Sequence, residues 1–165
     1  MLSARLDGYP HLRPRRPGHF CAAMARGLAG CGLGALLAVA REALRIYDDE
    51  NIVAHVRAME PHFLGGLREL LDHPLVGEVR GAGLVAGVEL VKEKTTGEAF
   101  DPADAVGPFC NDSAEDHGLI VRAIGDTISF CPPLIISKDE IAEMLARFRQ
   151  ALDDTLAMVQ ERGLQ

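Results

Sequence analysis

The pattern of apolar residues changes from irregular to periodic near residue 36. Residues 1–35 show no consistent period, and their prolines and glycines interrupt any long helix, so we expect an irregular or disordered N-terminal arm. From residue 36, apolar residues recur every three or four positions and predict an amphipathic helix that ends at the acidic run 48–50. A second helix should follow, with Asn51 as its N-cap, a kink at Pro61, and an end at His73 and Pro74.

Several segments of the chain are predicted to be strands. In residues 84–91 the alternation predicts one strand, and the glycines at 81 and 83 predict a bend or bulge between it and a short strand at 78–80. Residues 119–122 and 127–131 are expected to form a hairpin around Gly125 and Asp126. These strands predict a small, mostly antiparallel sheet.

Two further helices are predicted in the C-terminal half. One spans residues 104–117 and should stop at Gly118. The last begins with a capping box of Ser137 and Glu140 and carries a single apolar stripe. We therefore predict an α+β fold for residues 36–165, a small, mostly antiparallel sheet with helices packed on one face.

Composition and charge narrow the class of protein. The chain has 165 residues, of which 48% are hydrophobic and 25% charged, which is typical of one globular domain. A formal net charge of -7 argues against a nucleic-acid surface, and no run of about 20 apolar residues predicts a membrane span. A cytoplasmic protein is the default expectation. The alternative is secretion, because an arginine-rich start, an apolar run and the triplet Ala38-Val39-Ala40 imitate a signal sequence.

The four cysteines and a few polar residues are further candidates for sites. No C-x-x-C pair is present, so the sequence indicates no zinc site, and Cys131 in its apolar run is expected to be a small buried side chain. Arg80 is expected to fix the bend after its short strand. His117, just before Gly118, is expected to act at the C-terminus of its helix.

Arg122 is the principal candidate for function. It stands among Leu119, Ile120, Val121 and Ile124, and a guanidinium beside such residues needs an anion, because it stays charged in proteins. That anion could be a structural carboxylate of this chain or the carboxylate of a substrate. The residues alone leave both readings open.

Three segments resemble the C-terminal small domain of class III PLP-dependent aminotransferases, the ω-aminotransferase family. They are EALRIYDDENI (42–52), HPLVGEVRGAGLVAGVEL (73–90) and GLIVRAIGDTISFCPPLIIS (118–137). The resemblance extends from about residue 38 to residue 163. It implies the small-domain fold of aspartate-aminotransferase-like enzymes. It also implies that Arg122, in its R-A-x-G-D segment, binds the carboxylate of an amino or keto acid.

The resemblance also shows what this chain lacks. Its three lysines, Lys92, Lys94 and Lys138, do not match the family's catalytic lysine, which belongs to a larger upstream domain. Where the family has T-x-S-G-H-P, this chain reads GLAGCGLGALLAVA (27–40), so residues 1–35 could be frame-shifted sequence or a genuine arm. We expect that the chain alone does not hold pyridoxal 5'-phosphate.

The function expected from the resemblance is that of part of a transaminase. The parent enzyme would move an amino group between an ω-amino acid or amine and a keto acid such as pyruvate. Its partners would be small amino and keto acids, and its sites would be built in a homo-oligomer. The alternative is a non-catalytic binding module that docks onto a full-length aminotransferase.

Overall fold

The structure, a computed structural model, describes residues 33–164, which fall into two units. The first unit, Met1–Glu50, is described from residue 33 and consists of helix α2 (Leu33–Asp49). This helix begins three residues before the predicted start and ends at the predicted acidic run. Arg45 bonds to Glu42 and Asp49 on its own helix surface. The expectation for residues 1–32 lies outside the described residues.

The second unit, Asn51–Gln165, opens with helix α3 (Ile52–Glu69) and the short 3-10 helix η3 (Leu70–Asp72). The helix continues through Pro61. The predicted capping role of Asn51 is wrong, because Asn51 has a left-handed backbone (φ 51°) and its side chain makes no capping bond. Its carbonyl oxygen instead accepts the first helical bond from the His55 amide at 3.0 Å.

Four antiparallel strands form one sheet in the order β1-β2-β4-β3. Their bounds are β1 (Val76–Ala82), β2 (Val85–Leu90), β3 (Arg122–Ile124) and β4 (Thr127–Phe130). The β3–β4 hairpin turns at Gly125 and Asp126, as predicted, and Gly125 takes the positive φ (59°) that a tight turn requires. The strand predicted at 119–122 is shifted, because β3 begins only at Arg122. At Gly83 the predicted bend is a full hairpin turn, which pairs β1 with β2.

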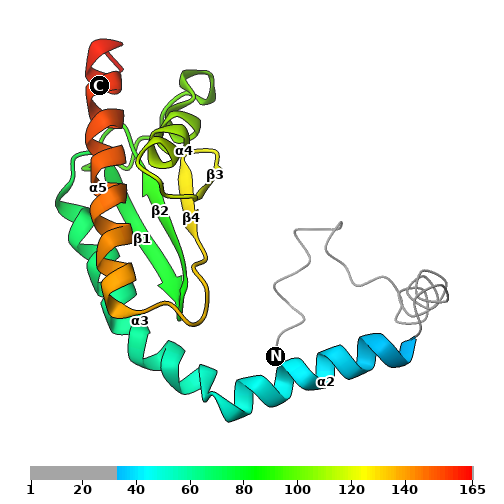
Figure 1. The fold of residues 1–165 in the computed structure, drawn as a ribbon. Helices are drawn as coiled ribbons and strands as arrows, with labels where there is room; N and C mark the ends of the chain where they lie inside the picture. The colour runs from blue at the N-terminus through cyan, green and yellow to red at the C-terminus, as the bar shows by residue number, and fades with distance from the viewer. Residues whose placement is uncertain (1–32, 165) are drawn as a thin grey trace, which may run out of the picture. The chain divides into compact units, whose positions relative to one another are not determined.

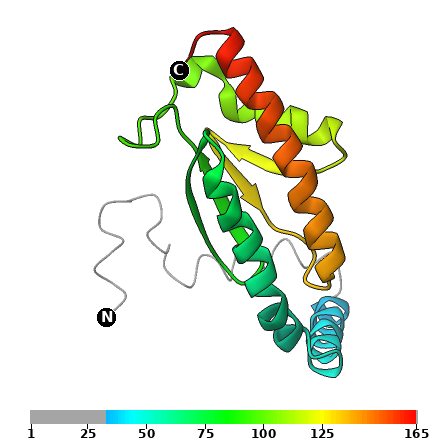
Figure 2. The ribbon, with the colours of Figure 1, turned by 90° about the vertical axis from the view of Figure 1, so that its left-hand side faces the viewer.

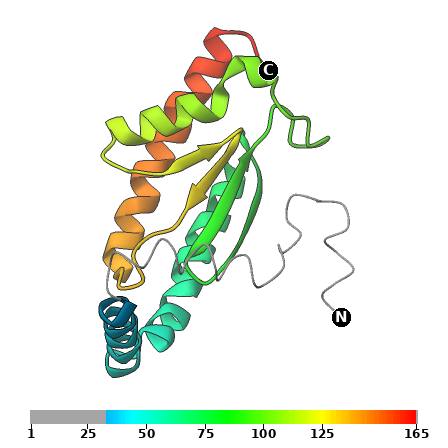
Figure 3. The ribbon, with the colours of Figure 1, turned by 90° about the vertical axis from the view of Figure 1, so that its right-hand side faces the viewer.

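Helices α3, α4 (Val106–Asp116) and α5 (Lys138–Glu161) pack on the sheet and enclose the core. Figures 1, 2 and 3 show α3 and α5 on the same side of the sheet. Ring contacts contribute to the packing, since the Phe130 and Phe148 rings meet edge to face with centroids 4.8 Å apart. The predicted fold class is therefore confirmed.

The predicted capping box at the start of α5 is also confirmed. The Ser137 hydroxyl accepts from the Glu140 amide at 3.3 Å, and the Glu140 carboxylate accepts from the Ser137 amide at 2.8 Å. From this start, α5 runs for 24 residues with its apolar stripe buried. No helix among residues 33–164 is long and apolar enough to cross a membrane.

Candidate functional site: the open face of the sheet and Arg122

Arg122 begins β3, an edge strand of the sheet, and its side chain is exposed. Alternate residues of this segment (Leu119, Val121, Ala123) pack against the core. The residues between them point the other way, and Ile120 and Ile124 are 88% and 60% exposed. Because side chains alternate along a strand, Arg122 lies on the face of the sheet away from the core.

The guanidinium of Arg122 has no acidic partner within the part of the chain that the structure describes. No carboxylate oxygen of residues 33–164 lies within 4.0 Å of it, and it makes no side-chain hydrogen bond there. Residue Arg122 is among the residues that line an open depression of about 380 Å³ between α4 and β3, with Pro108, Asn111 and Asp112. The structural ion pair that the sequence left open is therefore not formed among these residues.

Strand register places Arg122 at one end of a row that crosses the whole sheet. Arg80 of β1 pairs with Gly87 of β2, Gly87 with Ser129 of β4, and Ser129 with Arg122 of β3. Directly paired residues point to the same face, so two arginines stand at the ends of the row with a glycine and a serine between them. With neighbouring strands about 4.8 Å apart, the row is roughly 14 Å long.

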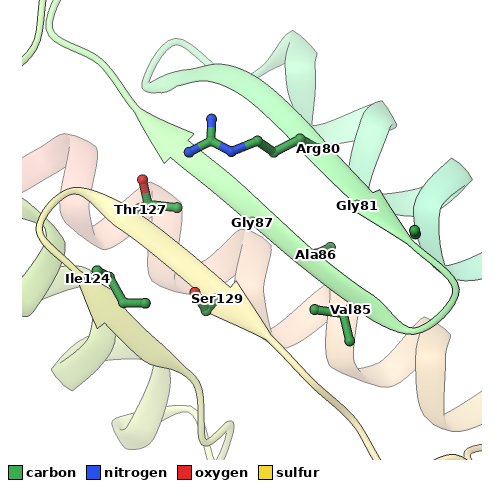
Figure 4. A pocket seen from close by; sticks show the side chains of 9 residues that line it. Arg80, Gly81, Val85, Ala86, Gly87, Ile124, Thr127 and Ser129 are labelled. Atoms are coloured by element: carbon green, nitrogen blue, oxygen red, sulfur yellow. The ribbon is translucent and has the colours of Figure 1, made fainter. Parts of the chain in front are cut away.

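This row lies on the face of the sheet opposite the helices, which we call the open face. Its residues are Glu78, Arg80 and Ala82 of β1, Val85, Gly87 and Glu89 of β2, Thr127 and Ser129 of β4, and Arg122 and Ile124 of β3. A shallow depression of about 570 Å³ covers much of it (Figure 4). Small side chains form its floor, and Val85 and Ile124 stand exposed at its edge.

The two arginines of the row differ in their charge environment. Arg80 donates to Glu78 Oε2 at 2.7 Å and to Glu89 Oε2 at 2.6 Å, and its side chain extends over β2 (Figure 4). The bonds to Glu89 and then Glu78 raise the pKa of Arg80 above its ordinary value. The expectation that Arg80 fixes a bend is wrong, because it lies within β1. Only the register of β1 with β2 brings Glu89 to Arg80, so the sequence alone does not predict this contact.

The cysteines offer no reactive or metal-binding cluster within the described residues. The expectation for Cys131 is wrong, since its side chain is exposed just after β4. Cys110 is buried in α4, and burial raises the pKa of its thiol to about 11. No group of three or more His, Cys, Asp or Glu residues in the described part could hold a metal ion.

Residues 31–152 match the family model for class-III aminotransferases, which is well over half of the chain. The chain belongs to this family. The match starts a few residues before the resemblance read from the sequence and includes β1 to β4, Arg80 and Arg122. The matched residues thus cover the whole four-stranded sheet and helices α3 and α4.

Curated and solved transaminases are similar to this chain, as its family membership predicts. A putrescine–pyruvate aminotransferase of Pseudomonas aeruginosa is 46% identical over 123 residues, which are 74% of this chain and 27% of that protein. A chloroplastic gamma-aminobutyrate transaminase of Solanum lycopersicum is 40% identical over 75% of this chain and 24% of its own length. The ω-transaminase of Pseudomonas jessenii, solved with PMP, superimposes with a TM-score of 0.72 at 38% identity, over 84% of this chain and 32% of that one.

The chain thus spans about a quarter to a third of the length of these transaminases.

The positions of its three lysines do not fit the lysine that would bind the family's cofactor. Pyridoxal 5'-phosphate enzymes hold the cofactor through a lysine Schiff base. Lys92 lies 3.7 Å from Glu98, Lys94 donates to the carbonyl oxygens of Leu71 and His73, and Lys138 begins α5. None of them lines the open face or the depression at Arg122.

Proposed function

We propose that this chain is part of a class III transaminase and that Arg122 binds the substrate carboxylate. The amino group would move between an ω-amino acid or amine and a keto acid such as pyruvate. The observation that carries the proposal is the exposed guanidinium of Arg122, which has no acidic partner among the described residues. The cofactor chemistry would come from a domain beyond these residues.

The bonding capacity of a free guanidinium supports this role. Its planar fork can hold a carboxylate through two parallel hydrogen bonds, each worth about 1.5–3 kcal/mol when a charged group takes part. Arg80 cannot compete for the same carboxylate, because Glu78 and Glu89 already neutralise it. A substrate acid would therefore orient at the Arg122 end of the row.

A first experiment tests what the chain does alone. We expect the purified chain, mixed with pyridoxal 5'-phosphate, to give no borohydride-trapped lysine adduct and no amino transfer from an amine to pyruvate. A full-length transaminase treated in parallel supplies the positive control. Turnover by the isolated chain would contradict the assignment of the chemistry to another domain.

A second experiment tests Arg122 itself in a reconstituted enzyme. Residues 38–163 would replace the matching segment of the Pseudomonas jessenii ω-transaminase. In an active chimera, Arg122→Gln should raise the KM for pyruvate by about tenfold or more, the cost of one charge-assisted bond, with little effect on an amine that lacks a carboxylate. Arg80→Gln is the matched control, and it should leave the pyruvate KM within about twofold. Equal effects of the two substitutions would reject a specific role for Arg122.

A second candidate function is a non-catalytic module that docks onto a full-length transaminase. The open face favours it, because Val85 and Ile124 are 59% and 60% exposed beside a depression floored by small residues. Size-exclusion chromatography with a full-length relative would test this function. A stable complex that Ile124→Glu abolishes would support docking, and separate elution of the two proteins would reject it.

A further inference from the structure

His73 occupies the turn between η3 and β1, where α3 and η3 end and the sheet begins. Its side chain is buried, with 5% of the residue exposed. The ring nitrogen Nδ1 accepts from the Leu75 amide at 3.3 Å, and the His73 carbonyl oxygen accepts from the Val76 amide at 3.1 Å. The side chain and the backbone carbonyl group of His73 therefore both stabilise the turn that leads into β1.

The bond from Leu75 determines which ring nitrogen carries the proton. A neutral imidazole has one N–H, and Nδ1 can accept only if it is the unprotonated nitrogen. The proton then lies on Nε2, which is buried and has no hydrogen-bond partner within the described part of the chain. The nearest acidic atom is Asp153 Oδ1 on α5, 3.5 Å away. The ring is thus held from one side by its own turn and faces a carboxylate on the other.

Charged groups surround this ring on three elements. Asp72 of η3 pairs with Arg149 of α5 at 3.3 Å, Asp153 faces Nε2 from α5, and Lys94 donates to the His73 carbonyl oxygen at 3.0 Å. Burial is the largest influence and lowers the pKa of His73, with Arg149 acting in the same direction. Asp153 and Asp72 oppose this shift and raise the pKa, but the net direction is downward. The neutral ring is therefore the form that this site favours.

We propose that His73 is a proton-controlled latch at the entry to β1. In the neutral state, the Nδ1 lone pair holds the Leu75 amide and keeps the η3–β1 turn closed. A proton that binds from solvent becomes an N–H on Nδ1, which removes the acceptor and sets two N–H groups against each other. The bond from Leu75 then breaks, and the turn loosens next to Leu75 and Val76, both of which are fully buried.

Loosening of the η3–β1 turn would also affect β1 and its residues on the open face. Val76 begins β1, the strand that carries Glu78 and Arg80. Loosening its start would weaken the pairing of Val76 with Leu90 at this end of the sheet. The latch thus gives the small domain a conformational response to acidification, whatever function the complete protein has.

Nitrogen NMR on the purified full chain tests the latch directly. At pH 8, the His73 ring should show an unprotonated Nδ1 and a protonated Nε2. Because the pKa of His73 is lowered from its ordinary 6.5, the ring should titrate below pH 6.5. Over that titration the hydrogen-exchange protection factor of the Leu75 amide should fall by about tenfold, as expected for one lost bond. The protonated Nδ1 tautomer at pH 8, a ring that never titrates, or an unchanged protection factor would each overturn the proposal.

A matched pair of variants separates the latch from general acid effects. His73→Asn keeps an acceptor oxygen close to the position of Nδ1 but cannot titrate, so its Leu75 protection should not change with pH. His62→Asn removes an exposed histidine of α3 and should behave like the wild type. A pH-dependent loss of Leu75 protection in His73→Asn would overturn the proposal, and the tautomer measurement stands even if that variant fails to fold.

Discussion

His117 Nε2 lies 2.7 Å from Asp154 Oδ2, and this contact joins the end of α4 to the middle of α5. The same carboxylate oxygen accepts the Ser113 hydroxyl at 2.9 Å. His117 was expected to act at the C-terminus of its helix, and it is the C-cap residue of α4, with its amide bonded to the Ser113 carbonyl oxygen. In addition, its side chain contacts a second helix, α5.

The first prediction concerns the pH dependence of this contact. The bonds from His117 and then Ser113 lower the pKa of Asp154 below its ordinary value of 3.8. A carboxyl group with a lowered folded-state pKa stabilises the protein above its ordinary pKa and loses that contribution as the pH falls through the folded-state pKa. Asp154→Asn should therefore cost about 0.5–1 kcal/mol of unfolding free energy at pH 6, because the pair is partly exposed, and less at pH 3.

Urea denaturation at the two pH values measures this difference. Asp116→Asn, at an exposed position of α4, is the control. It should change the unfolding free energy by the same small amount at pH 3 and at pH 6. An Asp154→Asn cost that is the same at pH 3 and pH 6 would contradict the proposed linkage.

The second prediction concerns the capping box of α5. Ser137→Ala removes the hydroxyl that accepts the Glu140 amide, so the unfolding free energy should fall by about 1 kcal/mol. Ser137→Thr keeps a hydroxyl and should lie within about 0.5 kcal/mol of the wild type. Urea denaturation of the three proteins gives the comparison, and equal losses in both variants would show that the hydroxyl is not the cause.

The third prediction concerns the reactivity of the thiols of Cys110 and Cys131. At pH 8, a thiol whose pKa is about 11 is ionised to only about one part in a thousand, and Cys110 is also buried. In a chain with Cys21 and Cys31 changed to serine, a disulfide reagent should label Cys131 rapidly and Cys110 only after unfolding in urea. Rapid labelling of two thiols in the folded chain would contradict the packing of α4.

The elements of this fold follow from local patterns, whereas the site depends on contacts between distant residues. The hairpin at Gly125 and the cap at Ser137 were predictable because each is determined by a few adjacent residues. The exposure of Arg122 follows from its place in an edge strand, where alternate residues face opposite sides, and its apolar neighbours alone do not reveal it. The row from Arg80 to Arg122 could not be predicted, since it depends on the register of four strands.

Two glycines on different helices give the fourth prediction. Gly107, in the first turn of α4, is buried and donates to Asp126 Oδ1 at 2.9 Å, and a Cβ there would collide with the Gly125 carbonyl oxygen. Gly107→Ala should therefore cost about 1–3 kcal/mol, because backbone must move to relieve the overlap. Gly65, inside α3, has no atom within 4 Å of the position of a Cβ, so Gly65→Ala should stabilise by about 0.5–1 kcal/mol.

Thermal and urea unfolding of the two alanine variants compares them with the wild type. Both substitutions replace glycine by alanine within a helix, so opposite signs would report the difference in local packing. Gly107 also determines how closely α4 approaches the β3–β4 turn, and thus the shape of the depression at Arg122. If Gly107→Ala were as stable as the wild type, α4 would have to lie farther from that turn. Asn111 and Asp112 would then no longer line the depression together with Arg122.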